Sequence, residues 1–599
     1  MSDDLRALLL ATAVAIGALH PSRPALIVGA GVVLIGAAGR WRMVLIVGAA
    51  LVAAGLAQRS LDGLDGLHDE VVHARITVLS DPTPAAGGLR FDARLGGRRV
   101  EVRARGSTEA SVRDVLAGEV LVVRGRTVPA DGSAPWLVPR HVAGRLDLAV
   151  VIGRDPGSAP ARAANALRRT LARGVAPFAL RERSLYTGLV IGDDREQPAD
   201  LADDFLGAGL THLLAVSGQN VAFVLTVAGP ALRRLRLWPR LALTLVVIAG
   251  FALVTRFEPS VLRASAMATV ATTVGTTGWP WSRIRVLATA ATLLLLTDPL
   301  LVRAVGFQLS VSAALAIVVL APVVESALPG PSWLRAPLSV TIAAQLGVAP
   351  VLLATFGPVP VASLPANLLA VPVAGLVMVW GLSGGLVAGI LGGASRTALQ
   401  LPTRLALAWL EQVAHRASLA PLGSLHASHL VALASGLLLA AWSPASWRTA
   451  GRVVAAGAVA AAVVTIHAPA PLRTEVAPGV VRWSRAGTEV VVLRGGGRTG
   501  GPSGPTVLDG LRRAGVSSID LLVVADESVD AEVVALVVRG RPVGGVLARH
   551  LGGEVDAPVA RPPPGESTVV VGALELHVDV LVDRIVVEAV PRGSAPGAG

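Results

Sequence analysis

Several ionisable and amide side chains lie inside apolar stretches of the sequence, where they are costly and therefore candidates for chemistry. The segment 211–220 reads THLLAVSGQN and contains His212, Ser217, Gln219 and Asn220. A polar group within a membrane span marks a binding site or a path, because lipid cannot solvate it. His212 and Gln219 are seven residues apart, and helical spacing would place them on one face. The alternative is a hydrogen-bonded seam that only packs helices together.

Further side chains of this kind follow downstream. Arg263 lies in the first turns of an apolar segment, where it either contacts a buried anion or extends its charged end to the membrane interface. Gln308, Gln345 and Asn367 are amides in later apolar segments, and Asn367 lies between two prolines in a stretch that we expect to be irregular. Each alone is compatible with helix packing, but together they predict a polar path or pocket.

The elements that must position these residues are membrane helices. The chain has 599 residues, of which 53% are hydrophobic and only 16% charged, against about 25% charged in a typical soluble protein. Three apolar blocks, Leu5–Leu19, Ala25–Ala38 and Met43–Ala57, predict short helices, the first uncleaved rather than a signal peptide. From His212 to His467 we expect roughly nine to eleven further segments. Two of them, Val286–Leu296 and Pro365–Leu376, are too short to span a bilayer.

Two polar regions flank this apolar core. Alternating runs such as Val71–Val78 and Arg98–Arg103 predict five or six short strands in a small barrel or sandwich. The region after residue 470 has predicted strands at Thr488–Leu493, Ile519–Val524, Ser567–Leu574 and Arg584–Val590, with a helix at Thr506–Ala514. The tail after residue 590 has a composition typical of disorder.

Arginine placement predicts a topology. Short basic loops are cytoplasmic by the positive-inside rule, and they occur at Arg40/Arg42, Arg233–Arg240, Arg283/Arg285 and Arg448/Arg452. Three spans precede the 58–150 region, and a final span, Val453–Ile466, precedes the last one. Both polar regions are therefore expected outside the cytoplasmic membrane of a bacterium.

The charge differs between the two polar regions. Residues 71–150 contain 12 arginines and 8 acidic residues, whereas residues 470–599 contain 13 arginines and 15 acidic residues. An excess of arginine favours a polyanion, although a solvated face explains it equally well. An arginine-rich amphipathic helix follows at 161–183, typical of a membrane surface or an anion contact. The candidate phosphate contacts are Arg98, Arg99, Arg103, Arg162, Arg168, Arg169 and Arg173.

The composition also excludes several classes of mechanism. The chain has no cysteine, so disulfides, iron–sulfur clusters and cysteine nucleophiles are ruled out. All 53 of its Lys+Arg residues are arginine, which rules out a Walker A phosphate loop and a pyridoxal Schiff base. No cofactor is expected.

At these segments the chain resembles the ComEC family of competence proteins, inner-membrane channels for DNA uptake in natural transformation. The resemblance rests on six motifs in order: Gly188–Asp193 (GLVIGD), His212–Gly218 (HLLAVSG), Pro259–Ala264 (PSVLRA), Gly306–Ser310 (GFQLS), Ala343–Leu346 (AAQL) and Pro365–Pro372 (PANLLAVP). It implies a polytopic α-helical membrane protein with an extracytoplasmic OB-like β-barrel domain and a C-terminal metallo-β-lactamase-like α/β domain. The implied parts are membrane helices (1–57), the OB-like domain (58–150), amphipathic helices (151–210), the channel core (211–468), the C-terminal domain (469–590) and the tail (591–599).

The sequence departs from the family pattern in two places. After Ser217-Gly218 the family usually has Leu-His, whereas this chain has Gln219-Asn220. Many relatives have H-x-H-x-D-H after a strand of the C-terminal domain, to hold two metals. Here only the aspartate, Asp530, remains, and the three histidine positions are Asp526, Ser528 and Ala531. His550 and His577 cannot rebuild such a site, so we predict a metal-free, catalytically inactive domain.

The resemblance implies a function and partners. The chain would conduct single-stranded DNA inward, with a cytoplasmic helicase-like ATPase as the driving force and an outer DNA receptor supplying the strand. Phe91 and Trp136 are the only aromatic residues in 71–150, which favours contacts to the DNA backbone over base stacking. The alternatives are a transporter of a smaller anionic solute that reuses the core, and a membrane-bound hydrolase, which the missing ligands nearly exclude.

Overall fold

The structure is a computed structural model whose described residues fall into two compact units. It describes residues 2–420, 424–425 and 472–592, apart from residues 40, 65–66, 86–87, 130–134, 215, 278–280, 357–358, 421–423, 496–501, 503, 515, 517, 552–554 and 582–583. The first unit comprises Met1–Gln197, His212–Thr355 and Ala370–Trp409, and the second comprises Pro198–Thr211, Phe356–Leu369 and Leu410–Gly599. Each unit is described by itself below.

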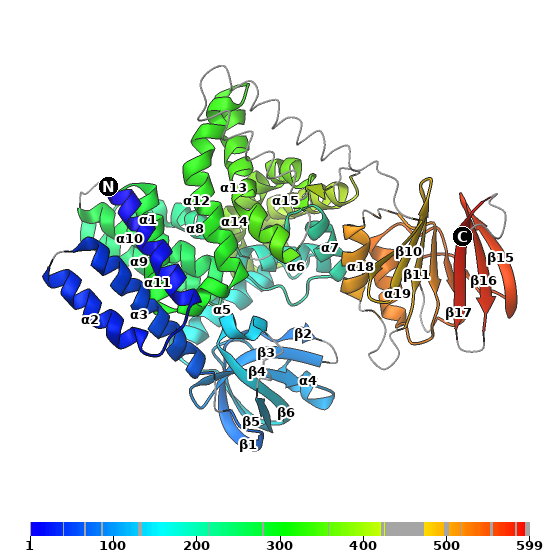
Figure 1. Cartoon of the computed structure of the whole chain (residues 1–599), viewed down its shortest axis with the longest axis horizontal. Coiled ribbons are helices and arrows are strands. Elements are labelled where there is room, and N and C mark those ends of the chain that lie inside the picture. The colour runs from blue at the N-terminus through cyan, green and yellow to red at the C-terminus, as the bar shows by residue number, and fades with distance from the viewer. Residues whose placement is uncertain are drawn as a thin grey trace. The chain divides into compact units, whose positions relative to one another are not determined.

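Three helices begin the first unit, in agreement with the predicted apolar blocks. They are α1 (Asp3–Leu19), α2 (Ala25–Ala38) and α3 (Arg42–Asp62), drawn in blue in Figure 1. Glycines let α2 and α3 approach closely: a Cβ on Gly29 would lie 2.6 Å from the Val52 nitrogen, and one on Gly48 would lie 2.8 Å from the Val33 nitrogen. Small residues at a helix interface are the usual means of close packing in membranes.

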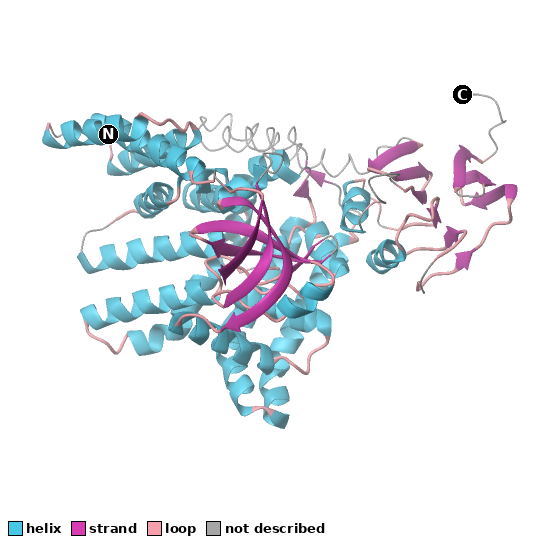
Figure 2. Ribbon diagram, turned by 90° about the horizontal axis from the view of Figure 1, so that it is seen from below, coloured by secondary structure: helices cyan, strands magenta, loops and turns pink. Residues whose placement is uncertain are grey.

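Six strands and a short helix form a closed barrel. They are β1 (Glu70–Val78), β2 (Thr83–Ala85), β3 (Gly88–Leu95), β4 (Arg98–Ala104), α4 (Ser107–Val112), β5 (Val120–Pro129) and β6 (Val142–Asp155). The pairing runs β1-β5-β6-β4-β3, and β3 pairs back to β1, which closes the sheet. The β4–β6 pair is parallel and the others are antiparallel. Figure 2 shows the strong curvature of these strands, whose inward side chains, such as Phe91 and Leu121, are buried.

Helices α5 to α15 form the apolar core. The elements of this core that belong to the first unit are, in chain order, α5 (Ala159–Gly174), α6 (Leu180–Ile191), the 3-10 turn η2 (Thr211–Leu213), α8 (Gln219–Leu232), α9 (Leu237–Val254), α10 (Pro259–Thr277), α11 (Arg283–Thr297), the 3-10 turn η3 (Pro299–Arg303), α12 (Val305–Ala327), α13 (Ser332–Phe356), α14 (Ser363–Leu391) and α15 (Gly393–Ser418). Four of these elements, η2, α13, α14 and α15, also have residues in the second unit. Among the described helices, five are long and apolar enough to cross a membrane: α3, α9, α12, α13 and α14.

Two expectations for the core segments are resolved. The short segment Val286–Leu296 lies in α11, which has only 15 residues. Pro365–Leu376, by contrast, is not a short or irregular segment, because it lies within the 29-residue helix α14. The helix continues through Pro372, since a proline costs one backbone hydrogen bond that packed membrane helices tolerate. The predicted last span, Val453–Ile466, and the loop containing Arg448 and Arg452 lie outside the described residues, as does the tail from residue 593.

The second unit contains an α/β domain with two sheets. One sheet has the order β14-β13-β12-β11-β10-β9, and the other is antiparallel with the order β15-β16-β17. Their bounds are β9 (Arg473–Ala477), β10 (Val480–Arg485), β11 (Thr488–Leu493), β12 (Leu521–Val524), β13 (Val546–Ala548), β14 (Val559–Ala560), β15 (Gly565–Val571), β16 (Leu574–Val580) and β17 (Ile585–Pro591). Strands β11 to β14 are parallel. The remaining elements of the unit are α7 (Ala199–Gly207), β7 (Val359–Pro360), β8 (Ser424–Leu425), α18 (Gly504–Arg513) and α19 (Ala531–Gly540).

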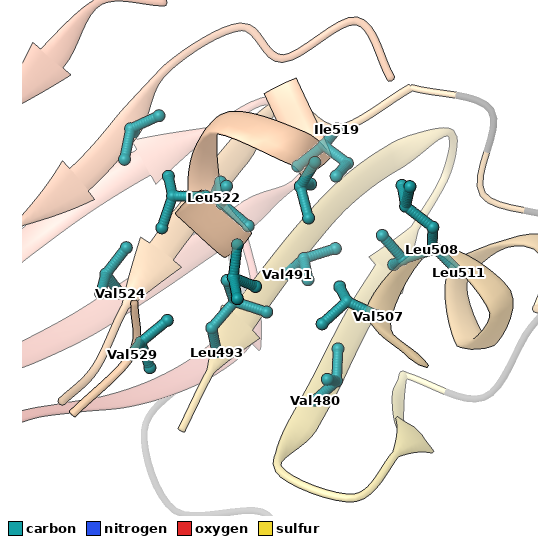
Figure 3. Close-up of a cluster of buried hydrophobic side chains, with 14 of the residues drawn as sticks. Val480, Val491, Leu493, Val507, Leu508, Leu511, Ile519, Leu522, Val524 and Val529 are labelled. Carbon is teal, nitrogen blue, oxygen red and sulfur yellow. The ribbon is translucent and has the colours of Figure 1, made fainter. Parts of the chain in front are cut away.

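Alternation along β11 accounts for the layers of this domain. Val491 and Leu493 pack with Leu508 and Leu511 of α18 and with residues of α19 in the cluster of Figure 3. Val490 and Val492 point to the opposite face and pack with residues of β16 and β17. A strand that is buried on both faces is continuously apolar, and the run VVVL at 490–493 therefore predicts this strand.

Helix α7 is held in the second unit by buried ion pairs. Asp203 is 5% exposed and its carboxylate lies 2.7 Å from Arg512 and 2.8 Å from Arg541. The neighbouring Asp204 lies 3.0 Å from His415 and accepts a hydrogen bond from Ser418, both at the end of α15. The segment that precedes the 211–220 motif is thus fixed by charges of the C-terminal domain.

The glycine packing of α2 and α3 can be tested with two alanine variants. A Cβ at Gly55 would lie 2.5 Å from the Leu26 Cα, whereas a Cβ at Gly31 on α2 meets nothing within 4 Å. We expect Gly55→Ala to destabilise the protein by about 1–3 kcal/mol, because overpacking forces the helices apart. Gly31→Ala is the matched control and should be neutral or mildly stabilising, since alanine favours helix over glycine. Thermal unfolding of the detergent-solubilised chain measures both; equal midpoints for the two variants would contradict this packing.

Candidate functional site in the helical core

A small pocket in the first unit gathers four of the predicted polar residues. His212 lies on η2, Ser217 lies just before α8, and Gln219 and Asn220 begin α8. Apolar residues of α6, α8 and α14 complete the lining: Leu189, Phe223, Val371, Ala374, Gly375 and Met378. The pocket is therefore polar along one wall and apolar along the other.

The geometry corrects the helical argument for His212 and Gln219. They do not lie on one helix, because His212 belongs to a 3-10 turn and α8 begins only at Gln219. Both nevertheless line the same pocket. Both are exposed, and among the residues that the structure describes neither side chain has a hydrogen-bond partner. They are the free polar groups of the pocket.

Asn220 and Ser217 have a different role, because they hold the motif in shape. Asn220 is 3% exposed, and its Nδ2 donates to the carbonyl oxygen of Leu189 at 2.9 Å. The Ser217 hydroxyl donates to Asn220 Oδ1 at 3.1 Å. On the other side, Gln197 Nε2 donates to the Leu214 carbonyl at 2.8 Å. A satisfied buried amide fixes the start of α8 against the end of α6.

Arg263 lies beside this motif with part of its guanidinium unpartnered. It is 7% exposed, and Nε and Nη1 are buried without a hydrogen-bond partner. A Cβ on Gly218 would lie 2.7 Å from Arg263 Nη2, so a larger residue there would displace the guanidinium from its present position. Ser260, one turn earlier on α10, donates to the Val216 carbonyl at 2.8 Å. An uncompensated buried charge is expensive, which makes this position the place where an anion would gain most.

The remaining amides lie elsewhere and do not line the pocket. The side-chain Nε2 of Gln308 on α12 donates to the Val302 carbonyl at 2.8 Å, and the backbone carbonyl of Gln308 accepts from the Ser312 hydroxyl. Gln345 is half-buried on α13. Asn367 lies in the first turns of α14 and donates back to the Ser363 carbonyl at 2.8 Å, an ordinary helical contact that replaces the irregular segment expected from sequence.

A buried ion cluster connects the barrel to the helices that carry the pocket. Asp81, in the loop after β1, binds Arg168 of α5 at 2.8 Å and Arg256 at 3.1 Å. All three side chains are at most 10% exposed. Arg168 also lies 3.3 Å from Asp193 and donates to the carbonyls of Ile191 and Val254. One guanidinium therefore joins the barrel loop to the ends of α6 and α9.

The cluster corrects the expectation that Arg168 contacts DNA phosphate. Its guanidinium is 3% exposed and fully engaged by carboxylates and carbonyls, so no external phosphate can reach it. Arg162, Arg169 and Arg173 are exposed on the other face of α5. Arg169 lies 3.1 Å from Glu119 of the barrel. Helix α5 is thus a structural link between barrel and core, and only its outer face is open to a ligand.

Asp193 and Asp194 follow the GLVIG segment, and their pKa values are shifted in opposite directions. Burial raises the pKa of Asp193, but hydrogen bonds from Arg195 and the charges of Arg195 and Arg168 outweigh it, so the net pKa is lowered. Burial raises the pKa of Asp194, and the charge of Asp193 adds to this effect. Asp193 is therefore an ionised member of the cluster.

The loop that carries Arg256 is strained. Arg256 and Phe257 have φ angles of 61° and 56°, in the left-handed region that costs non-glycine residues about 1 kcal/mol or more each. Arg256 Nη2 also donates to Asn165 Oδ1 at 2.7 Å. The loop runs directly into α10, which begins at Pro259 and carries Arg263. Asp81 and Asn165 hold this turn in place.

On the barrel, arginines gather on the outer face of β3 and β4. The register pairs Arg90 with Arg103 and Arg94 with Arg99. Within the described part of the chain, Arg90 and Arg94 have no ion-pair partner, while Arg103 binds Glu101 at 3.2 Å. Arg99 donates to the Arg140 carbonyl at 2.8 Å. Arg98 lies at the β3–β4 turn and is exposed. Sequence reasoning missed Arg90 and Arg94, which period-2 alternation along 88–95 would have placed on this face.

The C-terminal positions that would hold metals in the resembled family do not fit a metal pair. The Asp530 carboxylate caps α19 by accepting from the Glu532 amide at 3.0 Å, and Ala531 has no ligand atom. Asp526 accepts from the Ser528 amide at 2.8 Å. No group of three potential ligands that could hold a metal occurs among the described residues.

Removing Asp81 tests whether the ion cluster supports the core. Asp81→Ala leaves two buried guanidiniums facing each other, so we expect a loss of about 3–5 kcal/mol in unfolding free energy. The control is Asp147→Ala on β6, whose partner Arg145 is 37% exposed and whose loss costs about 0–1 kcal/mol. Thermal unfolding of the purified chain compares them. Equal stability of the two variants would show that the cluster is not needed.

Comparison with known proteins finds relatives for the part of the chain that contains the pocket. Residues 189–447 match the family described as Competence protein. The chain is also similar to ComE operon protein 3 of Bacillus subtilis (strain 168), with 27% identity over 190 residues, 31% of this chain and 24% of that protein. The alignment therefore spans about a quarter of that relative's length. No solved structure matches the chain. The matched region contains the pocket motif, Arg263 and the long apolar helices α9, α12, α13 and α14, and it is this part of the chain that is similar to competence proteins of the ComEC family.

Proposed function

We propose that the chain is a channel for single-stranded DNA across the bacterial cytoplasmic membrane, acting in competence. The observation that carries the proposal is the competence-type core together with a barrel whose arginines Arg90 and Arg94 are unpaired among the residues described. A strand of DNA requires a basic surface for its phosphates and a polar route through apolar helices. The unpaired arginines of the barrel and the polar residues of the pocket, both in the first unit, support these two requirements.

The barrel supports an OB-type reading. Leaving out the short β2, its strands pair in the order first, fourth, fifth, third, second and back to first, with α4 between the third and fourth. OB folds are five-stranded barrels that bind oligonucleotides on the face of their second and third strands. These correspond to β3 and β4, which carry Arg90, Arg94, Arg99 and Arg103. Arg98 at their turn and Arg162, Arg169 and Arg173 on the outer face of α5 are proposed as further phosphate contacts.

Inside the core, the proposed path uses the pocket and Arg263. His212 and Gln219 offer free polar groups, and Arg263 offers a buried guanidinium with unpartnered nitrogens. Phosphate is the anion for which a guanidinium is best suited. Gln308, Gln345 and Asn367 are proposed as polar positions further along the core.

The proposal includes a topology and partners. Both the barrel and the C-terminal domain face outward, as the arginine-rich loops predict. The C-terminal domain is proposed to be a degenerate metallo-β-lactamase-like domain that does not cut DNA, because Ser528 and Ala531 replace metal ligands of the resembled family. A helicase-like ATPase in the cytoplasm would pull the strand, and an outer receptor would deliver it.

Substitution of the unpaired barrel arginines tests the DNA surface. The double variant Arg90→Gln/Arg94→Gln should weaken binding of a single-stranded oligonucleotide by the full chain, because two phosphate contacts are lost. The slope of log K against log salt should fall by about 1.4, or 0.7 for each contact. Arg124→Gln is the control, since Arg124 is exposed on β5 and equally charged. An unchanged slope in the double variant would remove the barrel from the DNA path.

A transformation assay tests conduction itself. A strain deleted for the chain should take up no transforming DNA, and the wild-type chain should restore it. Arg263→Gln should lower the transformation frequency about tenfold or more, the effect of one lost charge-assisted contact. Arg240→Gln, an exposed arginine of α9, should restore it fully. Normal transformation of the deletion strain would refute the channel and leave the transporter of a smaller anion as the better function.

A further inference from the structure

A crevice in the C-terminal domain lies at the carboxyl ends of its parallel strands. It is a shallow, open crevice lined by the ends of β12 and β13, the residues that follow them and the start of β17: Val524, Ala525, Asp526, Glu527, Arg549, His550, Arg584 and Ile585. Open parallel sheets bind their ligands at this edge. The crevice therefore occupies the position where a ligand is expected, although the residues around it do not fit metals.

The cations of the crevice are unpaired and its acids are occupied. In the described ranges, neither Arg549 nor Arg584 has a carboxylate partner. Arg549 donates only to the Leu581 carbonyl, at 3.2 Å. Glu527 pairs instead with His550 at 3.2 Å. Asp526 accepts from the backbone of its own loop. The groups left available to a ligand are thus two guanidiniums.

Backbone contacts hold the main chain around these arginines in place. Asp526 and Arg584 form an antiparallel bridge, and the Ile585 amide donates to the Ala525 carbonyl at 2.7 Å. At the end of β11, a Cβ on Gly495 would lie 2.7 Å from Asp526 Oδ2. Glycine at this position lets the strand end approach the 525–528 loop. The arrangement is a built concavity rather than a set of scattered surface charges.

We propose that this crevice binds a phosphate group through Arg549 and Arg584, in a domain that performs no hydrolysis. Two planar guanidiniums suit the oxygens of a phosphate, and an anion at this point satisfies charges that no carboxylate of the described chain satisfies. The phosphate is either the terminal monoester of a nucleotide or an internal diester of a strand. The inference concerns a different domain from the barrel and does not depend on DNA conduction.

The test uses the full chain in detergent and phosphorus NMR. Thymidine 5′-monophosphate should show saturable line broadening with the wild type. Arg549→Gln and Arg584→Gln should each weaken binding about tenfold, as loss of one charge-assisted contact implies. Arg584→Lys should retain part of it, because charge remains while the planar fork is lost. Arg561→Gln, exposed and outside the crevice, is the control, and equal unfolding midpoints exclude misfolding.

A second arm identifies the source of the phosphate. An oligothymidine without terminal phosphates is added to the Arg90→Gln/Arg94→Gln chain, so that the barrel does not mask binding. Binding of the mononucleotide alone assigns a monoester site, and binding of both assigns a site for a strand. The proposal is overturned if neither probe binds saturably, if both arginine-to-glutamine variants bind like the wild type, or if the purified chain contains two stoichiometric metals. Because the barrel variants are separate, failure of the DNA proposal would not affect this outcome.

Discussion

The carboxylate of Asp81, held between Arg168 and Arg256, is the interaction on which the first unit depends. Asp81 belongs to a barrel loop, Arg168 to the helix that leads out of the barrel, and Arg256 to a turn between core helices. Burying two guanidiniums costs far more than their packing returns unless an anion faces them. The barrel supplies the carboxylate that faces both arginines, whereas Asp193 faces Arg168 alone. Arg256 and Arg168 are therefore both stabilised by the barrel loop.

This arrangement connects the barrel to the pocket along two physical routes. Arg168 binds the carbonyl of Ile191 at the end of α6, and two residues earlier the Leu189 carbonyl accepts from Asn220 of the pocket. Arg256 fixes a strained turn that leads into α10, whose Ser260 binds the Val216 carbonyl. The barrel loop and the pocket motif are therefore connected through a series of hydrogen bonds. Networks of this kind can carry energetic coupling between two sites.

Local patterns revealed the elements but not their long-range partners. The apolar block Ala25–Ala38 and the strand Thr488–Leu493 have the same bounds in sequence and structure, because periodicity and composition are local properties. The polar residues of 211–220 were recognisable as a group for the same reason. Their geometry was not, since the chain turns through a 3-10 segment that heptad spacing ignores. The role of Asp81 was also hidden: Asp81-Pro82 has the composition of a turn, and its partner Arg168 is 87 positions away.

The same limitation explains why net charge says little about this protein. The formal charge of +12 treats Arg168 and Arg94 alike, yet one is buried among carboxylates and the other is exposed without a partner among the described residues. The two arginines differ in whether a carboxylate faces the guanidinium, and this depends on the fold. Arg168 serves four acceptors at once, Asp81, Asp193 and two carbonyls, and a guanidinium has five donors in a planar fork. A lysine could not replace it. An arginine surrounded by acidic residues therefore stabilises the fold through buried ion pairs, whereas an arginine without them is available to contact an external anion.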